Sequence, residues 1–328
     1  MRRVFFGLPS VFEKIDCALA IGNFDGVHRG HQALLHEVVS SARARGLVPA
    51  VLTFEPHPKE FFGATDLVRI STLRDKVNAI LECGIERVYI GRFDQSLASM
   101  TPVEFAKDYL CEGLACRWVT VGENFAFGAG GKGHFETLEE LGRHYGFEAY
   151  CTPMLYHGQA RISSSRIRAA LELGDLFDVA DMLGHRMYVT GRVVHGAALG
   201  RTLGFPTLNT SVIPPYSKAK FGLHGVFAVK VWGLTGSANT PLLGVASVGF
   251  KPTVTEQKRW LLETHLFDWS GDAYGKLVRT EFVAKIRDEK KFSGLDELTQ
   301  AIKDDAQKAR EILGRSVTND LATSIFAF

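Results

Sequence analysis

The chain has 328 residues, of which 46% are hydrophobic and 23% are charged, and its 38 Lys and Arg against 36 Asp and Glu give a net charge of +2. These proportions are typical of a soluble globular protein, and they exclude a disordered chain and the strongly basic field that drives non-specific nucleic-acid binding. The length predicts two domains. No apolar run approaches the roughly 18 residues of a membrane span, so we expect no membrane partner.

The first half of the chain alternates short apolar runs with helical patterns. The runs predicted as strands are Ala18–Ile21, Ala50–Phe54, Val88–Ile90, Trp118–Val121 and Ala149–Cys151. Residues 32–45 carry a helical apolar face, Thr101 to Glu104 form a capping box with Pro102 at the first helical position, and a further helix follows Ser165. Strands alternating with helices predict a doubly wound parallel sheet, an α/β domain with both faces covered.

The pattern changes near Gly184 to strand, turn, strand. The predicted strands are Gly225–Val231, Leu242–Val248, Arg259–Trp269 and Val278–Ile286, and the inner side of the last one carries Phe282, Ala284 and Ile286. Short strands between Gly- and Pro-bearing turns predict a small antiparallel β-barrel. A terminal helix starts near Ser293, capped by Ser293 with Asp296. Its predicted buried face is Leu295, Leu298, Ile302, Ala309 and Ile312. The domains are therefore expected at residues 1–184 and 185–328.

A glycine- and histidine-bearing run from Gly22 to His31 links the first predicted strand to the first helix. The edge of a parallel sheet and the start of a helix together favour anion binding. His28 and His31 can donate to one phosphoryl group and stabilise charge that develops at an α-phosphate. The alternative is two ordinary loop histidines near a helix start. The other candidate phosphate-binding residues of this run are Gly22, Asn23, Phe24, Asp25 and Gly26.

Two further segments add candidates in the first half. Ser164 and Arg166 stand at a predicted helix start and suit a second phosphate site, although an ordinary serine cap explains them as well. Asn124, Phe125 and Phe127 follow a predicted strand and precede a glycine-rich loop. The two phenylalanine rings can stack on a planar ligand or simply close the core.

The second half carries its own glycine-rich constellation. Gly191, Gly196 and Gly204 permit a backbone to approach a polyphosphate. Thr207 and Asn209 offer side-chain oxygens two residues apart, which suit Mg²⁺, and a satisfied hairpin loop is the alternative. Glu263 lies in mid-strand between apolar neighbours and can act as a general base toward a hydroxyl that attacks a γ-phosphate. A solvated strand face is the plainer explanation for a lone glutamate.

These motifs resemble those of the prokaryotic bifunctional riboflavin kinase/FMN adenylyltransferase family. In the first half the resemblance lies in Gly22 to His31, with Thr53 to Pro58 downstream. It implies transfer of AMP from ATP to FMN, with Mg²⁺, to give FAD and pyrophosphate. By the same resemblance Asn23, His28 and His31 contact ATP phosphates, Ser164 and Arg166 serve the second phosphate site, and Asn124 lies beside the flavin.

The resemblance of the second half is to the riboflavin kinase part of the same family. It lies in Gly200 to Asn209, Gly225 to Phe227 and Glu263 to Asp268. It implies that Thr207 and Asn209 bind Mg²⁺ with the nucleotide. It also implies that Glu263 is the catalytic base on the riboflavin 5′-hydroxyl, in a small closed β-barrel with a C-terminal helix.

The sequence departs from the family pattern mainly in the glycine-rich loop. The loop is often basic in the family, whereas Phe125 to Gly131 contain no cation and only Lys132 follows. This departure motivates one rival hypothesis, a working riboflavin kinase with a weakened adenylyltransferase half. The second rival is a flavin-binding protein without turnover. The five cysteines, odd in number and without a Cys-x-x-Cys pair, favour a reducing, cytoplasmic location.

Overall fold

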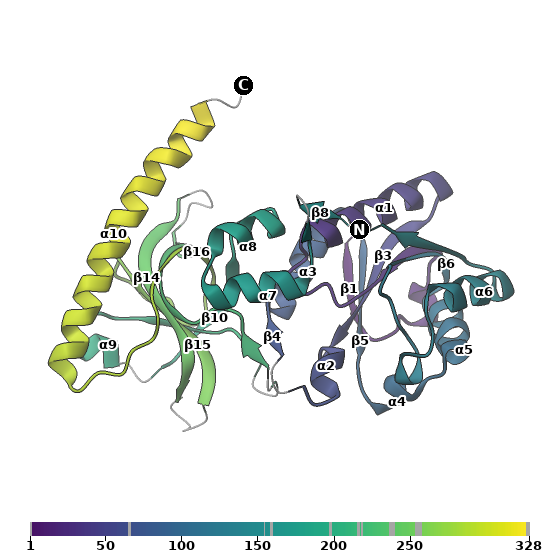
Figure 1. The fold of residues 1–328 in the computed structure, drawn as a ribbon, viewed down its shortest axis with the longest axis horizontal. Helices are drawn as coiled ribbons and strands as arrows, with labels where there is room; N and C mark the ends of the chain where they lie inside the picture. Colours follow the sequence, from purple (N-terminus) through teal and green to yellow (C-terminus); the bar gives the residue numbers. More distant parts are fainter. Residues whose placement is uncertain are drawn as a thin grey trace. The chain divides into compact units, whose positions relative to one another are not determined.

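The computed structural model describes residues 2–64, 67–153, 155–157, 160–196, 199–214, 217, 219–235, 240–252 and 258–325. The chain forms two compact units, shown as ribbons in Figure 1. The first unit comprises Met1–Leu67 and Leu73–Ser164, and the second comprises Val68–Thr72 and Ser165–Phe328. Helix α7 (Ser164–Leu173) therefore packs, from Ser165 onward, with the second unit, as does α8 (Leu176–Leu183). The functional boundary at Gly184 stays a prediction.

A six-stranded parallel sheet forms the centre of the first unit, in the order β1-β5-β3-β2-β6-β7. The strands are β1 Arg3–Phe6, β2 Cys17–Ile21, β3 Val48–Glu55, β5 Arg87–Arg92, β6 Cys116–Gly122 and β7 Glu148–Thr152. Five of them cover the predicted apolar runs. β1 was not predicted, because it is a short edge strand whose residues are mostly exposed and show no apolar alternation.

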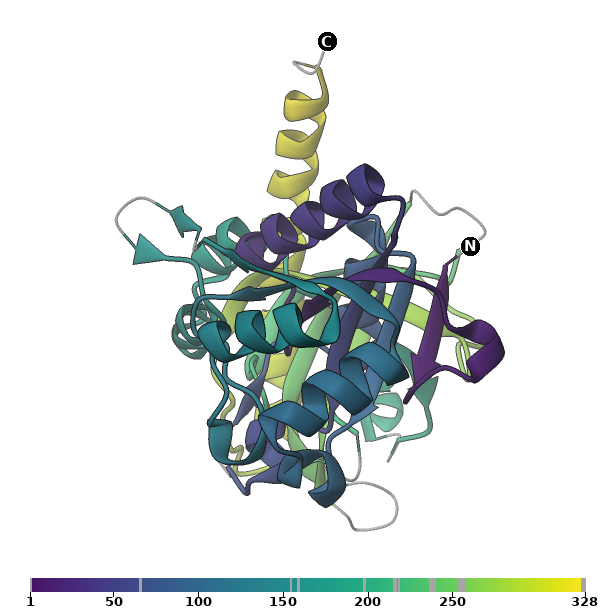
Figure 2. The ribbon, with the colours of Figure 1, turned by 90° about the vertical axis from the view of Figure 1, so that its right-hand side faces the viewer.

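Helices cover both faces of this sheet, as Figure 2 shows for the first unit. α1 (Arg29–Arg45) and α3 (Leu73–Glu82) pack on one face, and a π-helix (Phe105–Gly113) and α6 (Phe135–Tyr145) pack on the other. The shorter helices of this unit are α2 Pro58–Phe61, α4 Gln95–Ser99 and α5 Pro102–Glu104. The doubly wound parallel sheet predicted from the sequence is confirmed.

The local helix signals of the first half were mostly right. The Thr101 hydroxyl accepts from the Glu104 N–H, and the Glu104 carboxylate accepts from the Thr101 N–H at 2.7 Å, so the capping box is present. The bonds of this box hold the pKa of Glu104 below its usual range. After α7 begins, Ile167, Ala170 and Leu171 form its buried face, as expected.

A closed six-stranded barrel forms the second unit, in the order β10-β11-β15-β14-β13-β16, and all its pairs are antiparallel. Its strands are β10 Tyr188–Val194, β11 Leu208–Ser211, β13 Gly225–Trp232, β14 Leu242–Pro252, β15 Lys258–Leu266 and β16 Leu277–Arg287. The barrel prediction is therefore confirmed. The smaller elements are α9 Leu199–Thr202, the parallel pair β4 Val68–Arg69 and β12 Lys220–Phe221, and, in the first unit, the antiparallel pair β8 Tyr156–His157 and β9 Ala160–Arg161.

The predicted inner face of β16 was wrong at Ile286, where the pairing of the strand is irregular. The pairing of β13 with β16 shifts register twice, between Val226 and Phe227 and between Ala228 and Val229. Phe282 packs against Phe227, whereas Ile286 packs with Val226 and Ala228 in the cluster that faces the terminal helix. Ile286 is itself skipped in the pairing at one of these shifts, so the alternation that includes Phe282 does not extend to it.

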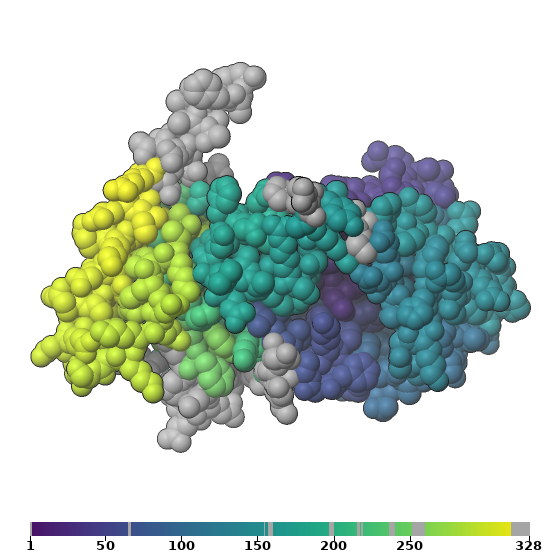
Figure 3. All heavy atoms as spheres, in the orientation of Figure 1, coloured from purple at the N-terminus to yellow at the C-terminus, as the bar shows by residue number. Residues whose placement is uncertain are grey.

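The terminal helix α10 (Leu295–Ile325) lies on the outside of the barrel against β13, β14 and β16, where Figure 3 shows its described part in yellow. Ala309 and Leu313 are fully buried, but Leu295 is 59% exposed, so the predicted face was wrong at its first residue. The cap was also misassigned, because the Ser293 N–H and hydroxyl both donate to Glu297, not to Asp296. No helix in the described part of the chain is long and apolar enough to cross a membrane.

An ion pair fastens α10 to the barrel, and its loss is a test of the fold. Arg287 donates from Nε and Nη2 to the Asp305 carboxylate at 2.7–3.0 Å, and Asp305 is 5% exposed. Because its partner Arg287 is less buried, we expect Asp305→Asn to lower the free energy of unfolding of the second unit by about 2 kcal/mol, below the loss for a fully buried pair. Urea unfolding followed by circular dichroism measures this change.

The matched control is Asp268→Asn, which breaks the exposed pair of Asp268 with Arg310 on the same helix. Water screens that pair, so its loss should leave the unfolding midpoint almost unchanged. Equal midpoints for Asp305→Asn and the parent protein would contradict the anchoring role.

Candidate functional site

The strand order of the first unit reverses beside β2. From β2 the chain moves outward through β3 and β5, and then returns to the other side of β2 with β6 and β7. The loops after β2 and β6 therefore lie at the carboxyl edge of the sheet where open parallel sheets bind their ligands. These two loops are the run from Gly22 to His31 and the segment from Glu123 to Gly128, the two segments that the sequence analysis selected.

The loop after β2 has an unusual backbone. Phe24 and Val27 have φ angles of 49° and 40°, in a region where residues other than glycine are uncommon and bulky side chains are strained. The Phe24 side chain is nevertheless buried, with 1% of its surface exposed. Its ring packs so closely on Gly22 that a Cβ added to Gly22 would lie 3.1 Å from the ring. Burial of the Phe24 ring therefore holds this strained loop in place.

The two histidines of the motif form one stacked pair. His28 caps α1, and its Nδ1 accepts a hydrogen bond from the His31 N–H at 3.2 Å. The centroids of the two imidazole rings are 3.7 Å apart, and the angle between the ring planes is 14°. Gly30 packs under the His28 ring, since an added Cβ would lie 3.2 Å from it. With Nδ1 occupied as an acceptor, a neutral His28 carries its proton on Nε2, which makes Nε2 a hydrogen-bond donor.

Ser164 and Arg166 have different surroundings. The Ser164 hydroxyl donates to the Asp25 carbonyl oxygen at 3.2 Å, so the start of α7 meets the histidine loop. Arg166 donates from Nη2 to Asp178 of α8 at 3.1 Å. No local sequence pattern predicts this ion pair, because Asp178 belongs to a separate helix. The phosphate role of Arg166 stays a prediction.

Asn124 has a partner that the sequence analysis missed. With its amide oxygen turned toward the guanidinium, Asn124 accepts a hydrogen bond from Arg161 Nη2 at 3.2 Å. Arg161 ends β9, and it lies only three residues before Ser164 in the sequence. The position of Arg161 near a candidate phosphate site in the sequence is the signal that could have identified it. Arg161 supplies a cation beside a loop that contains almost none.

The two loop phenylalanines pack on each other. Phe125 and Phe127 are stacked 5.4 Å apart, and Phe127 in turn contacts Phe105, which stacks on Tyr109. Phe127 is 6% exposed and belongs to the core, while Phe125 is half-buried. Burial, together with the nearby Asp94 carboxylate, raises the pKa of Tyr109 to about 12. The core function of Phe127 is thus a finding, and flavin contact by either ring stays a prediction.

A second aromatic group at the same sheet edge was not predicted. Phe93 follows β5 and lies edge-on to Phe54, Phe61 and Phe62, with centroid distances of 5.5–5.7 Å. Phe62 is 67% exposed, although it belongs to this cluster. The exposed Phe62 ring, which contacts Phe61 and Phe93, offers a flat apolar surface to a planar ligand.

In the barrel, strand register brings two candidates together. Asn209 on β11 lies directly opposite Glu263 on β15, so their side chains share one face with Cβ atoms about 4.5–5.5 Å apart. Asn209 is 5% exposed, and its Oδ1 has no hydrogen-bond partner among the described residues. Gly196 packs against this amide so closely that an added Cβ would lie 2.3 Å from Nδ2. The arrangement leaves a buried oxygen next to a half-buried carboxylate.

The other two candidate glycines have separate structural reasons. An added Cβ at Gly191 would lie 2.3 Å from the Thr210 methyl group, so β10 and β11 approach too closely there for any side chain. Gly204 has open space around it but a φ of +83°, which other residues rarely adopt. Neither observation tests a contact with phosphate.

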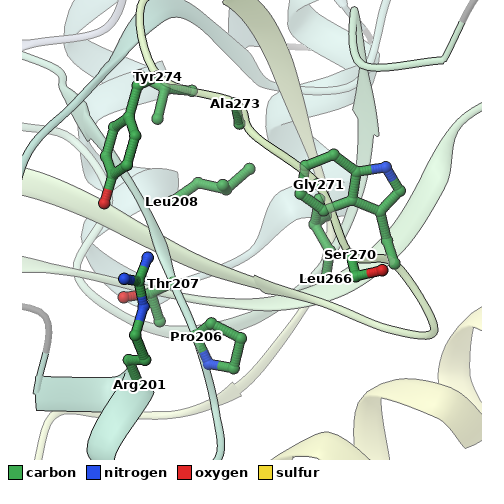
Figure 4. A pocket seen from close by; sticks show the side chains of 11 residues that line it. Arg201, Pro206, Thr207, Leu208, Leu266, Ser270, Gly271, Ala273 and Tyr274 are labelled. Atoms are coloured by element: carbon green, nitrogen blue, oxygen red, sulfur yellow. The ribbon is translucent and has the colours of Figure 1, made fainter.

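Thr207 lines a pocket of about 180 Å³ in the second unit. Figure 4 shows the Arg201 guanidinium and the Tyr274 hydroxyl on the same side of the pocket as Thr207. The His195 ring stacks on Tyr274 at 3.9 Å, and the Gly275 N–H donates to the Val193 carbonyl, which ties this wall to β10. No group of three His, Cys, Asp or Glu suited to a metal occurs within the described ranges. Any metal at Asn209 would therefore rest on amide, hydroxyl and single carboxylate ligands.

Comparison with known proteins agrees with these two constellations. The family model described as FAD synthetase matches residues 12–166, and the one described as riboflavin kinase matches residues 183–313. The bifunctional riboflavin kinase/FMN adenylyltransferase of Escherichia coli is 43% identical over 91% of this chain and 93% of its own. That of Bacillus subtilis is 35% identical over 90% and 92%. This chain belongs to the bifunctional riboflavin kinase/FMN adenylyltransferase family.

One solved structure resembles the chain over nearly its whole length. It is described as a macrolide-efflux protein from Streptococcus pneumoniae, with a TM-score of 0.72 and 27% identity over 94% of this chain and 98% of its own. The family models and the curated relatives confirm the resemblance predicted from the motifs at the level of the family, and both expected motif sets lie within the matched residues.

Proposed function

We propose that this chain phosphorylates riboflavin with ATP to FMN in the barrel, and then transfers AMP from a second ATP to FMN at the parallel sheet, releasing FAD and pyrophosphate. The observation that carries the proposal is that each unit assembles its own constellation from its own residues. In the first it is the stacked pair of His28 and His31. In the second it is the facing pair of Asn209 and Glu263.

For adenylyl transfer we assign charge stabilisation to the histidine pair. An FMN phosphate oxygen attacks the α-phosphorus of ATP, and the bond from that phosphorus to the bridging oxygen breaks as pyrophosphate leaves. His28 Nε2–H and the neighbouring His31 supply preorganised donors to the charge that grows on the α-phosphate. Gly22, Asn23, Phe24, Asp25 and Gly26 line the phosphates in this proposal, with Ser164 and Arg166 at the second phosphate site.

For the kinase step we assign the general base to Glu263. Its carboxylate accepts the proton of the riboflavin 5′-hydroxyl as that oxygen attacks the γ-phosphorus, and ADP leaves. The neighbouring pocket of about 180 Å³ beside Thr207 suits the nucleotide, since Arg201 offers a cation and Tyr274 a ring. Gly191, Gly196 and Gly204 belong to the loops that approach its phosphates.

We also propose that Asn209 and Thr207 hold Mg²⁺ with the nucleotide. The buried Asn209 Oδ1, which has no partner among the described residues, is the kind of oxygen that a hard cation takes as a ligand. When bound, Mg²⁺ supplies positive charge that neutralises the phosphates. Gly196 keeps the amide oriented, because a larger residue would displace it.

The flavin of the adenylyltransferase site is assigned to the region of Asn124, Phe125 and Phe127. Arg161, which binds Asn124, supports a working adenylyltransferase over the rival with a degraded first half, because it supplies positive charge near a loop that lacks it. A cytoplasmic location belongs to the same proposal, and the five cysteines, all free, favour a reducing compartment.

Two substitutions should separate the activities. Glu263→Gln keeps the shape and removes the base, and should lower FMN formation from riboflavin by about a hundred- to ten-thousandfold. His31→Ala removes a donor at the α-phosphate and should lower FAD formation from FMN by roughly a hundredfold or more, so that FMN accumulates. Chromatography of flavins after incubation with ATP and Mg²⁺ measures both steps.

Each of these variants serves as the control for the other, because each should retain the activity of the opposite unit. A folded Glu263→Gln protein that loses both activities would refute the role of Glu263. A His31→Ala protein that makes FAD at the parent rate would refute that of His31.

The metal assignment has its own test. Asn209→Ala removes one proposed Mg²⁺ ligand, so the Mg²⁺ concentration for half-maximal FMN formation should rise about tenfold or more. A Mg²⁺ titration of riboflavin phosphorylation measures the shift, and the Mg²⁺ dependence of FAD formation by the same protein is the internal control. An unchanged titration curve for FMN formation would remove Asn209 from the metal site.

We propose that residues 1–184 form the adenylyltransferase and residues 185–328 the kinase. A fragment of residues 185–328 should fold and phosphorylate riboflavin. We expect a fragment of residues 165–328 to melt at a higher temperature than the fragment of residues 185–328. The longer fragment retains the contact of Leu171 with Gly222 and that of Gly174 with Lys285. A folded but inactive 185–328 fragment beside an active 165–328 fragment would move the functional boundary to Ser164.

A further inference from the structure

Lys76 is a buried lysine at the carboxyl edge of the parallel sheet. It belongs to α3 and is only 6% exposed. Its ammonium group donates to the Asn23 carbonyl at 3.2 Å, to the Thr53 hydroxyl at 3.2 Å and to the Phe54 carbonyl at 3.3 Å. Lysine is rarely buried to this extent, because removing its charge from water is costly unless the surroundings compensate. A buried cation at this position therefore needs a reason.

The three acceptors belong to the loop of the histidine motif and to the neighbouring strand end. Asn23 begins the loop after β2, and Thr53 and Phe54 lie at the end of β3. The Thr53 hydroxyl is also 3.1 Å from the Asn23 carbonyl and donates to it. The Asn23 carbonyl thus accepts two hydrogen bonds, one from each of two elements, which matches its two lone pairs.

This pair of bonds determines the orientation of the next peptide group. In a trans peptide the C=O and the following N–H point in opposite directions. Holding the Asn23 carbonyl toward Lys76 therefore turns the Phe24 N–H to the other side of the loop. Phe24 has a φ of 49°, so this segment would relax if the carbonyl were released.

We infer that Lys76 is a positioning residue for adenylyl transfer. It binds the carbonyl groups at the rear of the phosphate loop, and so keeps the loop N–H groups and the His28 cap in the arrangement that receives the nucleotide. It also neutralises carbonyl dipoles that would otherwise repel an anion. The inference rests on the proposed function of the first unit, and it adds a residue that lies outside the motif run.

The test compares Lys76→Met with the parent chain in both reactions. Methionine keeps much of the length and removes the charge. We expect kcat for FAD formation from FMN to fall about a hundredfold, as when a misplaced catalytic group loses its alignment. KM for FMN should change less than about threefold, because Lys76 does not contact the flavin in this scheme, and FMN formation from riboflavin should keep the parent rate.

Further variants separate alignment from general loss of charge or fold. Arg74→Met removes an exposed cation from the same helix and should leave both activities unchanged. Thr53→Val removes the other donor to Asn23 while Lys76 remains, and should lower kcat for FAD formation by a smaller factor than Lys76→Met does. Lys76→Arg restores the charge and should recover part of kcat. Lys76→Leu, which also removes the charge, replaces the methionine variant if that protein does not fold.

The outcomes are distinct. A parent chain that makes no FAD from FMN would refute the proposed function itself. An active parent together with a folded Lys76→Met or Lys76→Leu protein of parent kcat would refute the role of Lys76 alone. A fall in kcat that Arg74→Met reproduces, or a fall that also appears in FMN formation, would overturn it as well.

Discussion

Both candidate sites depend on how strands place their ends and faces relative to their neighbours. In the first unit the strand order reverses beside β2, so the loops after β2 and β6 lie at one carboxyl edge. A backbone that leaves a parallel strand there can turn its N–H groups toward an anion at the start of the next helix. The His28 bond to the His31 N–H then fixes the first turn of α1, and the stacked rings follow from that bond.

In the barrel, antiparallel strand register brings the candidate site residues together. Asn209 and Glu263 are far apart in sequence, yet they are directly opposite on β11 and β15. A slip of one residue would turn one of the two side chains to the other face of the sheet. Gly196 approaches Asn209 and Gly191 approaches Thr210 so closely that neither glycine position has room for a Cβ, so β10 and the segment after it pack tightly against β11. The glycines of the motif therefore have a packing reason that is independent of any phosphate.

The sequence predicted the features that depend on residues close to one another in the chain. The alternation of strands and helices, the capping box at Thr101 and the position of His28 and His31 between a strand and a helix all depend on residues close in the chain. It missed contacts between distant segments, such as Lys76 with Asn23 and Arg166 with Asp178. It also failed at Ile286, because the register shifts between β13 and β16 interrupt the alternation and leave no mark in the pattern of residue types.

Two of the missed residues, Lys76 and Arg161, are cations, and this has a physical reason. A lysine or arginine in an amphipathic helix or a short strand looks like a solvated surface residue, and only the fold reveals that Lys76 is buried or that Arg161 meets Asn124. Positive charge near a phosphate site can thus come from any element whose end reaches the same sheet edge. A glycine-rich loop poor in basic residues, such as that from Phe125 to Gly131, is then compatible with anion binding, because the charge resides in neighbouring elements that a motif comparison does not cover.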